Sequence, residues 1–129
     1  AGGLVTRSLT QCVAISAPGN YDLIAHTFTN SSIGDAANRV QVTFFGGASC
    51  GGANLGTFTT TGSAALPDTW TERSRVNGVL PGGTASALVE LYVDSGTQAT
   101  PSNSDVLFDN VRFGPAGTVP VELSGFTVE

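Results

Sequence analysis

Short runs of alternating apolar and polar residues fill this chain, and clusters of Gly, Pro, Asn and Ser separate them. Successive side chains of a β-strand point to opposite faces, so this pattern is typical of strands with one buried face. No run has the longer period of an amphipathic helix. The sequence therefore predicts an all-β fold, a jelly-roll-like β-sandwich of two antiparallel sheets with about eight strands.

The alternation also predicts which side chains face the core. In the run at residues 39–45, Val40, Val42 and Phe44 are expected to face inward. In the run at 21–29, one face carries Tyr21, Leu23, Ala25 and Thr27, and the other carries Asp22, Ile24, His26 and Phe28. A length of 129 residues fits a single domain spanning residues 1–129. The predicted strands span residues 4–15, 21–29, 39–45, 55–61, 70–76, 85–93, 105–113 and 119–128.

The last of these runs has the features of an edge strand. Pro120 has no backbone N–H to donate to a sheet, and proline within a strand is therefore confined to edges. Gly125 is a candidate bulge that changes the face of the residues after it. The segment is a candidate for strand exchange between subunits through its apolar residues Val119, Val121, Leu123, Phe126 and Val128.

Charge is sparse and acidic. Charged residues make up 12% of the chain, the formal net charge is −5, and lysine is absent. The five Arg residues are scattered, so nucleic acids and anionic membrane surfaces are not expected partners. No stretch approaches the roughly 20 apolar residues of a membrane span. Few charges also leave the sheet edges with little protection against pairing with other strands.

The chain has two cysteines, Cys12 and Cys50, and they lack the C-x-x-C spacing of a metal site. We interpret them as a disulfide, which implies an oxidising, extracellular location for a processed chain. The alternative is a pair of buried free thiols.

No catalytic apparatus is apparent, and we expect no enzymatic activity. His26 is the only histidine, and it shares a strand face with Ile24 and Phe28, which favours a structural or surface role. No serine lies in a G-x-S-x-G context, and the spacing of the acidic residues favours no catalytic pair.

Several segments together resemble one known group of proteins. They are QCVAI at 11–15, PGNYDL at 18–23, VQVTFF at 40–45 followed by CGG at 50–52, Trp70, PGGTASA at 81–87 and VLFDNV at 106–111. In this order they are similar to secreted bacterial jelly-roll modules of the carbohydrate-binding type, over residues 9–114. Modules of this type usually open with a further strand before the QCV segment, and here only residues 1–10 precede that segment. Three interpretations are open: the chain is a fragment, it is processed, or the strand comes from elsewhere.

The resemblance implies a polysaccharide partner, a core position for Trp70, and a structural calcium for which Asp109 is the candidate ligand. The alternative for Asp109 is a buried carboxylate that accepts backbone hydrogen bonds. Sugar-binding surfaces need exposed aromatic rings. Tyr92 alternates with Leu91 and Val93 and is expected to face outward, and Tyr21 is the second candidate.

Two functions follow from these features. The first is a non-catalytic, secreted module that binds a polysaccharide. The alternative is a self-assembling extracellular structural subunit, in which copies of the chain join into a filament by strand complementation. In that case the C-terminal strand fills the edge left open by the missing opening strand, either in its own chain or in a neighbour.

Overall fold

A computed structural model describes residues 6–16, 19–29, 37–60, 69–94, 106–117 and 127–128. Its strands are β1 (Thr6–Ala14), β2 (Asn20–Thr29), β3 (Ala37–Phe45), β4 (Asn54–Thr59), β5 (Thr71–Val79), β6 (Ser86–Asp94), β7 (Val106–Pro115) and β8 (Thr127–Val128). Within these residues the only helical element is a short 3-10 turn, η2 (Ala48–Cys50).

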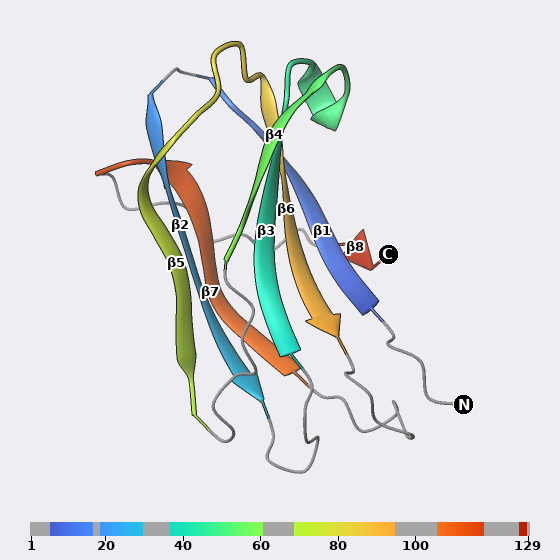
Figure 1. The fold of residues 1–129 in the computed structure, drawn as a ribbon, viewed down its shortest axis with the longest axis vertical. Coiled ribbons are helices and arrows are strands. Elements are labelled where there is room, and N and C mark those ends of the chain that lie inside the picture. The colour runs from blue at the N-terminus through green and yellow to red at the C-terminus, as the bar shows by residue number, and fades with distance from the viewer. Residues whose placement is uncertain are drawn as a thin grey trace.

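The strands form two antiparallel sheets that pack face to face as a β-sandwich (Figure 1). One sheet has five strands in the order β4-β3-β6-β1-β8, and the other has three in the order β5-β2-β7. The predicted fold class, an all-β sandwich of two antiparallel sheets, is confirmed. β4 and β5, which follow one another in the chain, are edge strands of different sheets.

The core lies between the sheets, and the predicted alternation places residues in it correctly. In β3, Val40, Val42 and Phe44 are buried, and in β2 the buried positions begin with Tyr21 and continue at every second residue. The apolar core comprises Tyr21, Leu23, Ala25, Val40, Val42, Phe44, Ala87, Val89, Leu91, Val111 and Phe113. Both sheets therefore bury one face of each central strand, as period-two sequences require.

The predicted disulfide is present and joins β1 to the turn after β3. Cys12 and Cys50 lie with their Cα atoms 6.0 Å apart. The buried Ser86 hydroxyl holds the same turn, because it accepts a hydrogen bond from the Cys50 N–H at 2.8 Å and donates one to the Gly47 carbonyl at 2.6 Å. The turn is thus fixed to both β1 and β6.

The three-stranded sheet contains two irregularities that the sequence pattern did not predict. The β2–β5 and β2–β7 pairings each shift register once, and Asn77 and Asn110 adopt positive φ angles of 59° and 52°. The buried Asp22 carboxylate accepts hydrogen bonds from the Asn77 N–H at 2.7 Å and the Gly117 N–H at 3.2 Å. Asp22 therefore satisfies backbone donors that the irregular ladders leave free.

The C-terminal strand lies at a sheet edge, as predicted. β8 pairs with β1 through Leu9 with Val128 and Thr10 with Thr127. Four of the apolar residues named for strand exchange, Val119, Val121, Leu123 and Phe126, lie outside the described residues.

The core position expected for Trp70 is wrong. Trp70 is 48% exposed and packs against the ring of Phe28, which lies on the outer face of β2. Trp70 directly precedes β5, an edge strand of the smaller sheet, and the opposite face of β2 supplies the core. The family resemblance suggested burial, whereas the face of the neighbouring strand determined exposure.

Candidate binding surfaces

The outer face of the five-stranded sheet carries Tyr92, the first residue predicted for sugar binding. Tyr92 faces outward as expected, because the preceding residue, Leu91, is buried in the core and successive side chains of a strand point to opposite faces. Its hydroxyl donates a hydrogen bond to Glu90 Oε2 at 2.6 Å, and the Arg39 guanidinium lies 4.5 Å from the centre of its ring. The ring is therefore already engaged by a cation of the same chain.

A network of polar side chains continues from Tyr92 across this face. Gln41 Nε2 donates to Glu90 Oε1 at 3.4 Å, and the Thr59 hydroxyl donates to Gln41 Oε1 at 3.0 Å. The Thr57 hydroxyl donates to the Thr43 hydroxyl at 3.3 Å. The face thus consists largely of side chains that already satisfy one another, and we refer to it as the Tyr92 face.

Tyr21, the second residue predicted for sugar binding, is not available to a ligand. It is 2% exposed, and its ring centre lies 5.2 Å from that of Phe44 and 5.3 Å from that of Phe113. Burial raises the pKa of the Tyr21 phenol, and the Arg75 guanidinium lowers it in part. The prediction for Tyr21 is wrong because the ring is a central part of the core.

A second surface with aromatic rings lies on the outer face of the three-stranded sheet. Trp70 and Phe28 pack with ring centres 5.4 Å apart and planes at 49°. Leu107, which is 55% exposed, lies directly opposite Phe28 on β7. These three residues form an apolar row: Phe28 and Leu107 share a face because they are opposite one another in a ladder, and Trp70, just before β5, contacts Phe28.

A row of ionisable residues lies next to the apolar row. His26 on the central strand is directly opposite Glu72 on β5 and Asp109 on β7. His26 Nδ1 is buried and has no hydrogen-bond partner, and Glu72 makes no hydrogen bond or ion pair within the described structure. The two rows together, Phe28, Trp70, Leu107, His26, Glu72 and Asp109, are called the Trp70 face below.

Sequence reasoning missed this surface, although one signal pointed to it. The alternation in β2 placed His26 and Phe28 on the face opposite Tyr21, and Tyr21 is in the core. An aromatic residue on the outward face of a central strand therefore needed cover from neighbouring strands. Trp70 and Leu107 are the residues that the register places beside it.

Asp109, the candidate calcium ligand, is exposed rather than buried, and its Oδ1 accepts a hydrogen bond from the Asn110 N–H at 2.8 Å. Within the described residues, no group of three or more His, Cys, Asp or Glu side chains is arranged to hold a metal ion. The calcium role of Asp109 stays a prediction.

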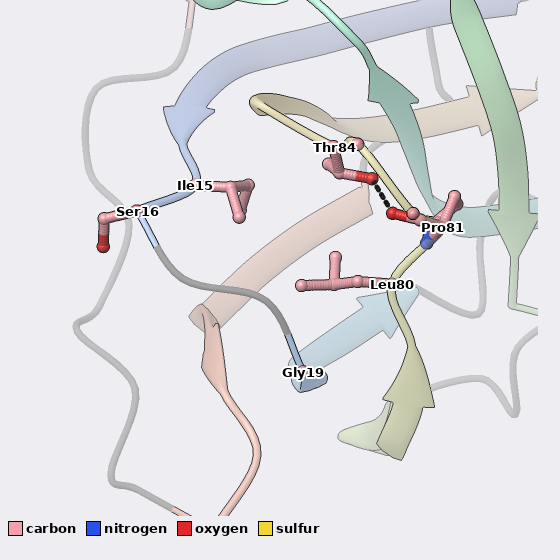
Figure 2. A pocket seen from close by; sticks show the side chains of 8 residues that line it. Ile15, Ser16, Gly19, Leu80, Pro81 and Thr84 are labelled. Atoms are coloured by element: carbon pink, nitrogen blue, oxygen red, sulfur yellow. Dashed lines mark hydrogen bonds between the residues drawn. The ribbon is translucent and has the colours of Figure 1, made fainter.

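A hollow of about 260 Å³ lies at the end of the sandwich where β1 ends and β5 leads into β6. Figure 2 shows the Ile15 and Leu80 side chains pointing into it from opposite sides, with Thr84 hydrogen-bonded to the Pro81 carbonyl at 2.6 Å. Among the described residues, its lining is apolar apart from hydroxyl and backbone groups and includes no titratable side chain.

The outer edge of β1 is a third surface with binding potential. β1 has nine residues, and within the described part of the chain β8 pairs with two of them. Residues 8–15 contain no charged side chain. An uncharged strand edge is a template for pairing with another strand.

None of the helical segments among the described residues is long and apolar enough to cross a membrane. A comparison with models of known protein families gives no match, and neither does a comparison with curated protein sequences.

Proposed function

We propose that the chain is a non-catalytic extracellular structural subunit that assembles by exchanging its C-terminal strand with neighbouring copies. The observation that carries this proposal is the pairing of β8 with the outer edge of β1. The chain therefore contains both a strand and an edge that accepts it. Such a contact has the same local geometry whether it forms within one copy or between two.

Two further features favour exchange over a purely internal contact. β8 follows β7 in the chain but belongs to the opposite sheet, so exchange of β8 breaks no ladder between these two strands. The uncharged edge at residues 8–15 lacks the charges that normally prevent sheets from associating. Exchange in which each copy gives its strand to the next forms an open filament.

The disulfide supports an extracellular setting and a stable acceptor. Disulfides persist in oxidising compartments, and Cys12 lies in the acceptor strand itself. The link to Cys50 holds β1 in place when its outer edge is vacant.

Deletion of residues 118–129 tests the proposal. The full chain should form concentration-dependent polymers in electron microscopy and sedimentation, and the deletion variant should remain folded and monomeric. A synthetic peptide of residues 118–129 should then bind the deletion variant, and a peptide with Thr127→Pro should bind more weakly because it loses a backbone donor. A full chain that stays monomeric at every concentration would contradict the proposal.

Polysaccharide binding of the type implied by the sequence resemblance is the second candidate, and the exposed Trp70 ring beside Phe28 favours it. An exposed aromatic ring with adjoining polar groups suits the apolar face of a pyranose ring. Retention on insoluble polysaccharides should fall with Trp70→Ala. It should change little with Tyr92→Phe, which keeps an aromatic ring on the Tyr92 face. A broad glycan array that stays blank with folded protein would remove this candidate.

A further inference from the structure

We infer that the Trp70 face takes a saccharide that carries protonated amines, in preference to neutral or acidic saccharides. This inference rests on the second candidate function and names the chemical class of its ligand. The preference for amines follows from the charged residues beside the apolar row.

The apolar row limits the shape of the ligand. Trp70 is 48% exposed, and Phe28 supports its ring from the central strand at a centre-to-centre distance of 5.4 Å. Leu107 extends the apolar surface to β7. Adjacent strands lie about 4.8 Å apart, so the row spans roughly 10 Å across the sheet. This shape suits a flat ring or a short run of linked rings.

The second row determines the charge of the ligand. Glu72 and Asp109 stand on either side of His26, one on each edge strand of the sheet. Glu72 has no basic partner within the described structure. An ammonium group bound next to Trp70 gains attraction both from the ring and from a carboxylate, whereas a uronic acid would be repelled by the same carboxylates.

Two basic residues lie near the ionisable row. Arg112 is opposite Ile24, on the side of that row away from Trp70. Arg73 follows Glu72 on β5 and lines the same hollow as Glu72, but it is opposite the buried Ala25 and so belongs by register to the inner face. Arg112 is on the same strand as Asp109, whereas Glu72 is two strands away on β5, so Arg112 offsets the charge of Asp109 more than that of Glu72. Glu72 is therefore the carboxylate expected to select the amine. It also lies only two residues from Trp70 along the chain.

The experiment compares oligosaccharides of equal length made of glucosamine, N-acetylglucosamine, glucose or galacturonic acid. Binding to the full chain is measured by calorimetry at a mildly acidic pH and low salt, where the amines are charged. We expect the glucosamine oligomer to bind most tightly and the galacturonate oligomer most weakly. Glu72→Gln should weaken glucosamine binding about fivefold, because it removes one carboxylate while keeping the side-chain shape.

Ser74→Ala, an exposed position on the same strand face, is the matched control and should leave binding unchanged. Equal binding of glucose and glucosamine oligomers, unaffected by Glu72→Gln, would overturn the inference while leaving saccharide binding intact. Absence of binding by every oligomer, with the fold retained, would overturn the second candidate function as well. Trp70→Ala should abolish binding of all the oligomers that bind.

Discussion

The two outer faces of the sandwich differ in how far their side chains satisfy one another. On the Tyr92 face, a chain of hydrogen bonds links Tyr92, Glu90, Gln41 and Thr59. On the Trp70 face, an imidazole nitrogen and a carboxylate have no partner within the described structure. The large apolar side chains that are exposed among the described residues, Trp70, Val76, Val79 and Leu107, all lie on β5 and β7 or directly beside them.

Because of this difference, we expect one outer face to contribute mainly to the stability of the fold and the other mainly to binding. A surface whose polar groups are already paired adds to the stability of the sheet, and a ligand must break those pairs to bind there. A surface with unpaired groups and exposed apolar side chains contributes less to the fold and has more to gain from a partner. We therefore expect substitutions on the Tyr92 face to lower the stability of the fold and substitutions on the Trp70 face to weaken binding. The following experiments test that contrast.

The largest effect is expected from the disulfide of the five-stranded sheet. Replacing Cys12 and Cys50 with alanine should lower the free energy of unfolding by about 4 kcal/mol, since the bridge closes a loop of 38 residues in the unfolded chain. Hydrogen exchange should show β1 loosening first, while β2 retains its protection. Uniform loosening of both sheets would show that the bridge does not act locally on the acceptor strand.

The three-stranded sheet should depend most on Asp22. Asp22→Ala removes a buried carboxylate that accepts two backbone hydrogen bonds, and we expect a loss of about 2 kcal/mol in chemical denaturation. Asp109→Ala, which alters an exposed carboxylate of the same sheet, is the control and should change stability by less than about 0.5 kcal/mol. Equal effects of the two substitutions would mean that the irregular ladders do not need Asp22.

A direct comparison of the outer faces uses two nearly isosteric substitutions. Tyr92→Phe removes the hydrogen bond to Glu90 and should cost about 1 kcal/mol of stability. Glu72→Gln should leave the free energy of unfolding unchanged within about 0.5 kcal/mol, because Glu72 has no partner to lose. The contrast between the faces fails if Glu72→Gln destabilises the fold as much as Tyr92→Phe.

The smallest effect concerns the pH dependence of the core. Burial raises the pKa of Tyr21 above its usual value of 10.0, so the folded chain retains this proton more tightly than the unfolded chain. The contribution of Tyr21 is complete below pH 10 and is lost as the pH rises towards the folded-state pKa. Thermal unfolding between neutral and strongly alkaline pH should show a decline that is shallower in Tyr21→Phe. Identical declines would assign the effect to other groups.

The sequence predicted the inner faces of the strands much better than the outer surfaces. Alternation is set by the backbone of a single strand, and it placed Val40, Val42 and Phe44 in the core correctly. The exposure of Trp70 depends on its neighbour Phe28, and the role of Asp22 depends on register shifts between strands. Such features arise from pairing between distant segments, which a period-two pattern does not encode.

The proposed exchange of β8 is tested most directly by cross-linking Thr10 to Thr127, which lie opposite one another. One copy carries Thr10→Cys with a size tag, the other carries Thr127→Cys, and the two are mixed and oxidised. We predict a disulfide-linked product containing both copies, whose yield rises with protein concentration. The account is contradicted if the mixture gives no such product while a chain carrying both substitutions closes its cross-link internally and stays monomeric at every concentration.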